Sequence, residues 1–162
     1  MQTAYFAGGC FWCIEAIFQR VNGVLSLASG YCNGTTKNPT YQEICAGDSG
    51  HAEVLKIEFD ETQISYTELL EIFVVVHDPT SLNQQGSDMG TQYRSAVFYT
   101  DNEQRDSAKK LIESIEGAVT EISPLDVFYV AEDYHQNYFN DNQNQPYCQM
   151  VILPKINKYL NK

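Results

Sequence analysis

The stretch AGGCFWCIEAIF, residues 7–18, links a strand, a tight turn and a helix. TAYFA (3–7) is typical of a short strand, and the two glycines that follow allow a sharp turn. Apolar side chains then recur at helical spacing, which predicts a helix beginning at Phe11. Cys10 and Cys13 therefore lie where a strand turns into a helix, on either side of the only tryptophan in the chain.

Length and charge restrict the class of protein. The 162 residues suffice for one core and no linker divides them, so we expect a single domain over 1–162. A net charge of −11 disfavours binding to nucleic acid or anionic lipid. No apolar run could span a bilayer, and the N-terminal residues do not resemble a secretory signal. We expect a cytoplasmic protein that binds neither nucleic acid nor membrane, with a monomer as the default state.

The remaining pattern predicts an α+β fold. Strands and helices interleave, but several strands are joined too closely for parallel crossovers, so we expect a mixed or antiparallel sheet. Capping boxes Ser65–Glu68 and Thr100–Glu103 predict two helix starts. The expected strands are 52–59, 94–99 and 119–130 with a break at Pro124, the expected helices are 65–76, 100–115 and 134–139, and 26–50 is expected to be a long loop region.

The cysteines point to thiol chemistry. Five cysteines, an odd number, argue against a structural disulfide framework. Only Cys10 and Cys13 have the short spacing of half a zinc site, so a zinc site is disfavoured. A helix N-terminus stabilises a thiolate, which predicts a lowered pKa for Cys10 and makes it the better nucleophile of the two. Two buried thiols acting as small apolar side chains are the alternative.

One carboxyl group lies on the apolar side of a predicted strand. In AEVLKIEF (52–59), Glu53 shares its face with Leu55, Ile57 and Phe59. Desolvation there would raise the pKa of Glu53 and let it act as a general acid. The alternative places Glu53 at a fraying strand end in water.

Other residues are candidates for contacts with a small substrate. Asp88 and Tyr93 lie in a loop bounded by glycines, where the tyrosine could donate to a substrate oxygen or simply be exposed. Phe11 and Trp12 could form an apolar wall for a methyl group or belong to the core. The histidines are expected to bond locally. Cys148 could reach Cys10 if the tail is mobile, or be a free thiol.

Four motifs together resemble the A-type peptide methionine sulfoxide reductases. The resemblance runs from residue 5 to about 155 and implies a two-layer α/β sandwich around a mixed, mainly antiparallel sheet, with a long irregular C-terminal segment. The motifs are GCFWCIEA (9–16), GYCNGTTKNPTYQEICAGDSGHAE (30–53), HDPTSLNQQGSDMGTQYRSA (77–96) and YVAEDYHQNYF (129–139).

The resemblance implies reduction of the S-epimer of methionine sulfoxide, free or in proteins, to methionine. Cys10 matches the nucleophile and Glu53 the acid. Methionine leaves, Cys10 becomes a sulfenic acid, and a resolving thiol forms a disulfide that thioredoxin or dithiothreitol reduces. No metal or organic cofactor is implied. Tyr41, Asp88 and Tyr93 match the residues that bind the sulfoxide oxygen, and Phe11 and Trp12 match the pocket for the S-methyl group.

The chain also departs from that family. NQPYCQMVILPKINK (144–158) resembles the branch with one resolving cysteine near the C-terminus, which points to Cys148. Cys13 occupies a position that is not always cysteine, and whether it resolves Cys10 directly is left open. Met89 stands where many members have histidine. Cys32 and Cys45 are expected to be bystanders.

Two other classes compete with this interpretation. A thioredoxin-like dithiol oxidoreductase is suggested by the Cys-X-X-Cys spacing. A metal-binding module without enzymatic activity is the second, and stoichiometric zinc in the purified protein would support it.

Overall fold

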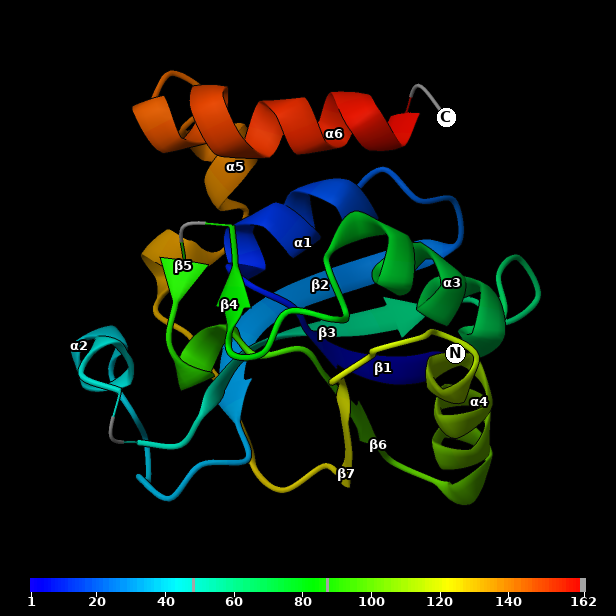
Figure 1. Ribbon diagram of the computed structural model, residues 1–162. Helices are drawn as coiled ribbons and strands as arrows, with labels where there is room; N and C mark the ends of the chain where they lie inside the picture. The colour runs from blue at the N-terminus through cyan, green and yellow to red at the C-terminus, as the bar shows by residue number, and fades with distance from the viewer. Residues whose placement is uncertain (48, 87, 161–162) are drawn as a thin grey trace.

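A computed structural model describes residues 1–47, 49–86 and 88–160. A six-stranded sheet in the order β7-β6-β1-β3-β2-β8 forms its centre (Figure 1). Only β6 and β7 run parallel, so the predicted mixed, mainly antiparallel sheet is confirmed. The strands are β1 (Gln2–Ala7), β2 (Val24–Cys32), β3 (Ala52–Phe59), β6 (Ala96–Tyr99), β7 (Glu121–Pro124) and β8 (Phe128–Val130), and β4 (Gln84–Gln85) pairs with β5 (Asp88–Met89) in a separate ribbon.

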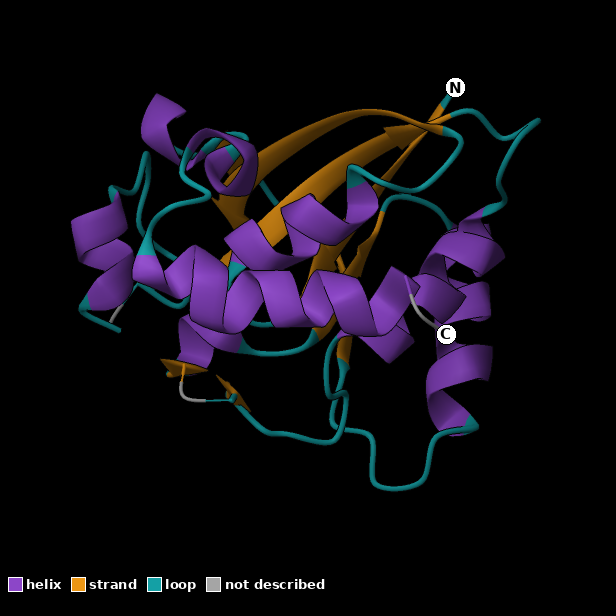
Figure 2. Cartoon of the chain, turned by 90° about the horizontal axis from the view of Figure 1, so that it is seen from above, coloured by secondary structure: helices purple, strands orange, loops and turns teal. Residues whose placement is uncertain are grey.

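Helices cover one face of the sheet. Figures 1 and 2 show α1 and α3 against the strands, with α6 crossing α1 on the side away from the sheet. Within the described residues, no helix has the length and apolar character needed to cross a membrane. The helices are α1 (Phe11–Phe18), α2 (Tyr41–Cys45), α3 (Tyr66–Val76), α4 (Asn102–Glu113), α5 (Tyr138–Asp141) and α6 (Leu153–Leu160), with 3-10 turns η1 (Thr91–Tyr93) and η2 (Asp133–His135) and a π-helical turn η3 (Cys148–Ile152).

The expected loop over 26–50 is wrong where β2 and α2 occupy it. Its first part belongs to β2, which pairs with β3 on one side and β8 on the other. Serine, alanine and glycine give this stretch little strand propensity, but pairing on both sides outweighs it. A Cβ at Gly30 would lie 2.4 Å from the ring of Phe128, so glycine is needed for this close approach. Further on, a capping box of Thr40 and Glu43 begins α2.

Two helix starts test the capping predictions. The box of Ser65 with Glu68 is confirmed at α3. The box expected at α4 is displaced by one residue, because Asp101 is the N-cap and accepts from the Gln104 backbone at 2.8 Å. The Gln104 side chain in turn accepts from the Thr100 backbone at 2.9 Å. Aspartate is at least as good an N-cap as threonine, which accounts for the shift.

The C-terminal segment is irregular only in its first part. Short turns and α5 carry the chain from β8 to Tyr147, as expected. From Cys148 the chain is helical, since η3 runs directly into α6. Buried Ile152 and Ile156 pack this helix into the same apolar cluster as Cys10 and Cys13. η3 and α6 are thereby packed against α1.

Candidate active site

The turn between β1 and α1 places Cys10 at the start of the helix. Gly9 has a φ of +81°, which favours glycine, and a Cβ at Gly8 would lie 2.8 Å from the ring of His77. The Gly9 backbone donates to the carbonyl of Tyr93 at 3.1 Å, which joins this turn to η1. Cys10 is the N-cap of α1 but makes no side-chain capping bond, so its thiol is available for chemistry.

Glu53 is in contact with the start of α1. It is 1% exposed and accepts a hydrogen bond from the Phe11 backbone at 3.1 Å. Burial raises the pKa of Glu53 to about 8, as the alternation of β3 predicts, and the alternative of a fraying strand end is wrong. The carboxyl group is therefore mostly protonated at neutral pH and can donate a proton.

The thiols of Cys10 and Cys13 shift each other's pKa in opposite directions. Burial, followed by a hydrogen bond to Cys13, raises the pKa of Cys10 well above its usual value. The bond from Cys10 lowers the pKa of Cys13 to about 7. The prediction of a lowered pKa for Cys10 is wrong for this resting state, because desolvation outweighs the helix N-terminus. Negative charge in the pair therefore rests on Cys13.

Two tyrosines lie near enough to the buried acid for its charge to affect their pKa values. Tyr41 begins α2 and Tyr93 ends η1, and both are partly buried against the cluster that holds Cys10. Burial raises the pKa of each phenol, and the charge of Glu53 raises both further. Both remain protonated at neutral pH and can donate hydrogen bonds to an oxygen atom beside Glu53.

Tyr147 connects the predicted Asp88 to the dithiol. Its hydroxyl donates to Asp88 Oδ2 at 2.8 Å and lies 3.6 Å from Cys13 Sγ. Sequence reasoning missed this residue; its only signal was its position next to Cys148. The contact brings β5 of the small ribbon to the start of α1.

Aromatic side chains from the C-terminal segment hold Trp12. Its ring stacks on Tyr138 with centroids 3.8 Å apart, and its Nε1 donates to Nδ1 of His135 at 3.0 Å. The expectation that His135 bonds only locally is therefore wrong. Phe11 is fully buried, between the rings of Tyr31 and His135. Of the two predicted pocket residues, Trp12 alone presents part of its surface.

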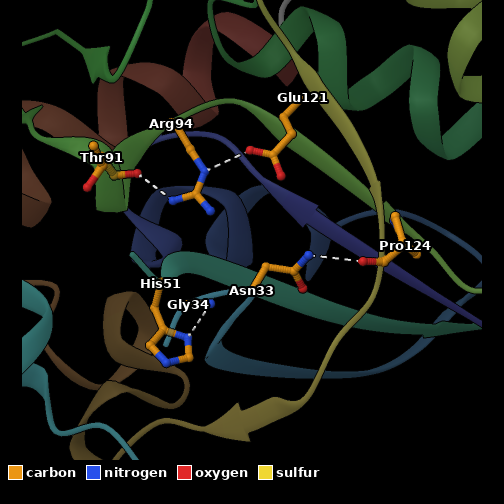
Figure 3. Close-up of polar contacts among 7 residues, drawn as sticks. All are labelled: Asn33, Gly34, His51, Thr91, Arg94, Glu121 and Pro124. Atoms are coloured by element: carbon orange, nitrogen blue, oxygen red, sulfur yellow. Dashed lines mark hydrogen bonds and ion pairs between the residues drawn. The ribbon is translucent and has the colours of Figure 1, made fainter. Parts of the chain in front are cut away.

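Hydrogen bonds fix the loops around the site. Figure 3 shows Arg94 donating both to Glu121 of β7 and to the carbonyl of Thr91, which holds η1 in place. The other bonds in this view are Gly34 to His51 Nδ1 at 3.1 Å and Asn33 to the Pro124 carbonyl at 2.9 Å. In the first of these bonds, the acceptor His51 lies two residues before Glu53 in the sequence. Hydrogen bonds therefore hold in place the segments that carry Tyr93 and Glu53.

The remaining cysteines have different surroundings. Cys148 is fully buried in η3, and burial raises its pKa. Cys32 is buried in the sheet and Cys45 is exposed at the end of α2. Among the residues that the structure describes, no three histidine, cysteine or acidic side chains are grouped so as to hold a metal ion.

A reactive thiol pair beside a protonated carboxyl group and hydroxyl donors is typical of a thiol-dependent oxidoreductase. Residues 2–162 match the family model for peptide methionine sulfoxide reductase. A relative from Vesicomyosocius okutanii, peptide methionine sulfoxide reductase MsrA, is 62% identical over 163 residues. The match covers 100% of this chain and 100% of the relative. The MsrA of Acinetobacter baumannii strain SDF is 50% identical over 166 residues, covering 100% of this chain and 95% of the relative.

Solved structures agree with the sequence relatives. Reduced Mxr1 from Saccharomyces cerevisiae has a TM-score of 0.86 and 33% identity, covering 91% of this chain and 88% of Mxr1. The methionine sulfoxide reductase A of Corynebacterium diphtheriae has a TM-score of 0.81 and 34% identity, covering 88% of this chain and 75% of the C. diphtheriae chain. The chain belongs to the peptide methionine sulfoxide reductase family, and within it to the A type. It is an oxidoreductase that acts on methionine sulfoxide, which sets aside the thioredoxin-like and metal-module alternatives.

Proposed function

We propose that this single-domain enzyme, acting as a monomer, reduces the S-epimer of methionine sulfoxide, free or in proteins, with Cys10 as nucleophile and Glu53 as general acid. The observation that carries the proposal is Glu53: it is buried, has a pKa of about 8, and hydrogen-bonds the first turn of the helix that Cys10 caps. A sulfoxide oxygen is a poor leaving group until it is protonated, and Glu53 is a proton donor at neutral pH.

The first step transfers the oxygen. Cys10 passes its thiol proton along the hydrogen bond to Cys13 and attacks the sulfoxide sulfur. Glu53 protonates the oxygen, and the hydroxyl group moves from the substrate sulfur to Cys10 Sγ. The bond between the substrate sulfur and its oxygen breaks, and so does the transient bond between the two sulfur atoms. The substrate sulfur is reduced to a thioether, and Cys10 is oxidised to a sulfenic acid. The proton held by Cys13 then replaces the one that Glu53 gave up.

Side chains around the dithiol bind the substrate. Tyr41 and Tyr93 donate hydrogen bonds to the sulfoxide oxygen, whose negative charge is largest as the new bond forms. Asp88 accepts from Tyr147 and contacts the oxygen through a bridging water. Trp12, with Phe11 beneath it, receives the S-methyl group.

The cycle closes through a disulfide. Either Cys148 or Cys13 condenses with the sulfenic acid, and thioredoxin reduces the disulfide; dithiothreitol replaces it in vitro. A crystal structure of Mxr1 in complex with Trx2 shares the fold of this chain, with a TM-score of 0.60 and 23% identity. The chemistry uses thiols and carboxyl groups alone, so no metal or organic cofactor is required. A reducing compartment such as the cytoplasm suits this cycle.

Chiral chromatography tests the proposal. Methionine sulfoxide racemic at sulfur is incubated with reduced protein and dithiothreitol. We expect the S-epimer to disappear, the R-epimer to persist, and Cys10→Ser to consume neither. If folded, reduced protein consumed neither epimer, the proposed function would be wrong; if it consumed both equally, the assignment of the epimer would be wrong.

A further inference from the structure

We propose that Cys13, rather than Cys148, forms the first disulfide with the sulfenic acid of Cys10. The inference rests on the proposed function, because it concerns the thiol that follows oxygen transfer. Cys13 was one of two candidates on sequence grounds, and the resemblance favoured Cys148. The surroundings of the three thiols favour Cys13 instead.

Cys10 and Cys13 are already in contact at the start of α1. Cys10 is the N-cap with extended backbone, and the Cys13 backbone donates to the Cys10 carbonyl at 3.1 Å. Each thiol shifts the pKa of the other, that of Cys10 upward and that of Cys13 downward, and both belong to one buried cluster. Joining them requires movement within one helical turn, and Cys-X-X-Cys pairs at a helix start form disulfides in this way.

Cys148 belongs to the same buried cluster but lies on a different element of the fold. It is fully buried in η3, and among the described residues the structure records no hydrogen bond between Cys148 and Cys10. Because η3 continues into α6, and both pack on α1, any closer approach of Cys148 to Cys10 has to shift this helix against α1. Loss of the buried contacts of Ile152 and Ile156 makes that movement costly. The first disulfide therefore forms faster with Cys13.

The surroundings of Cys13 suit a nucleophile. A pKa of about 7 makes close to half of this thiol a thiolate at neutral pH, whereas the pKa of Cys148 is raised. Tyr147 lies 3.6 Å from Cys13 Sγ and donates to Asp88, so a path of polar contacts leads from Cys13 to Asp88. No such path starts at Cys148 among the hydrogen bonds of the described residues.

The step balances without another reactant. Cys13 Sγ attacks Cys10 Sγ, a bond forms between the two sulfur atoms, and the bond from Cys10 Sγ to its hydroxyl breaks. The hydroxyl leaves as water with the proton that Glu53 received from Cys13 after the first step. Both sulfur atoms end in the disulfide oxidation state, and a dithiol such as that of thioredoxin returns them to thiols.

A single turnover without reductant tests the inference. Reduced protein is mixed with methionine (S)-sulfoxide, quenched at successive times with an alkylating reagent, and digested for mass spectrometry, while methionine is measured in the same samples. Dimedone in a parallel series traps the sulfenic acid. The variants are Cys13→Ser and Cys148→Ser, with Cys45→Ser, an exposed cysteine, as the matched control.

We expect the first disulfide of the wild type to join Cys10 and Cys13, and Cys148→Ser and Cys45→Ser to form it at the wild-type rate. In Cys13→Ser, trapped sulfenic acid should persist roughly ten times longer or more. A first disulfide between Cys10 and Cys148, or accumulation of sulfenic acid in Cys148→Ser, would overturn the inference while methionine formation upheld the proposed function. Absence of methionine in every folded sample would overturn both.

Discussion

Replacing Glu53 by glutamine removes one proton and little else from the site. The amide has the shape of the carboxyl group and keeps an oxygen that can accept from the Phe11 backbone. It cannot transfer a proton to the sulfoxide oxygen. Because a pKa of about 8 leaves roughly nine tenths of the Glu53 side chains protonated at pH 7, almost every wild-type molecule has the acid that the variant lacks. We expect methionine formation to slow by roughly 100- to 10,000-fold, the usual contribution of a general acid.

The pH profile of kcat/KM separates the acid from the thiols. In the wild type the rate should rise through the pKa near 7 of the thiol pair and fall through the pKa near 8 of Glu53. About one tenth of the wild-type Glu53 carboxyl groups are still protonated at pH 9, so kcat/KM should fall about tenfold for each further pH unit. Glu53→Gln should lose the falling limb and keep the rising one.

Rapid quenching and chromatography of methionine between pH 6 and 10 measure both effects. Glu58→Gln, on the outer face of the same strand, is the matched control and should leave the profile unchanged. A rate for Glu53→Gln within threefold of the wild type, or a falling limb near pH 8 that survives the substitution, would refute the assignment of Glu53 as the acid.

Two further predictions concern stability and the hydroxyl donors. The pKa of Glu53 is raised from 4.5 in a solvated chain to about 8 on folding, so wild-type stability should fall as the pH rises from about 4.5 to 8. Glu53→Gln should therefore be more stable than the wild type by on the order of 3 kcal/mol at pH 7 and about equal to it near pH 4, as urea unfolding at both pH values would show. Tyr41→Phe and Tyr93→Phe should each lower kcat roughly tenfold with little change in KM, because their hydrogen bonds strengthen as charge develops on the oxygen. A rise in KM at constant kcat would instead indicate ordinary substrate binding.

Local patterns predict the parts of the site that depend on neighbouring residues. The alternation of β3 places Glu53 on the buried face, and the glycines with the helical spacing after them place Cys10 at a helix start. Both rules act over a few residues, so the sequence contains all they need. The capping box of Ser65 is confirmed for the same reason.

Contacts between distant segments were not predictable in this way. Trp12 meets His135 across 123 residues and Tyr147 meets Asp88 across 59, and no local pattern encodes either pair. The pKa of Cys10 was predicted with the wrong sign, because the helix N-terminus is a local property and desolvation depends on everything packed around the thiol. β2 was missed because its partners, β3 and β8, supply the stability that its own residues lack.

Burial has opposite consequences for the two groups that must react together. It keeps Glu53 protonated at neutral pH, which the acid needs, and it keeps Cys10 protonated, which the nucleophile does not need. A dry site can combine a protonated carboxyl group with an attacking thiolate only if a neighbour accepts the thiol proton. Cys13 is that neighbour, because it is hydrogen-bonded to Cys10 and has the lower pKa. Its position one turn into α1 also places it beside the sulfenic acid, so we propose that one side chain serves the first step as a base and the second as a nucleophile.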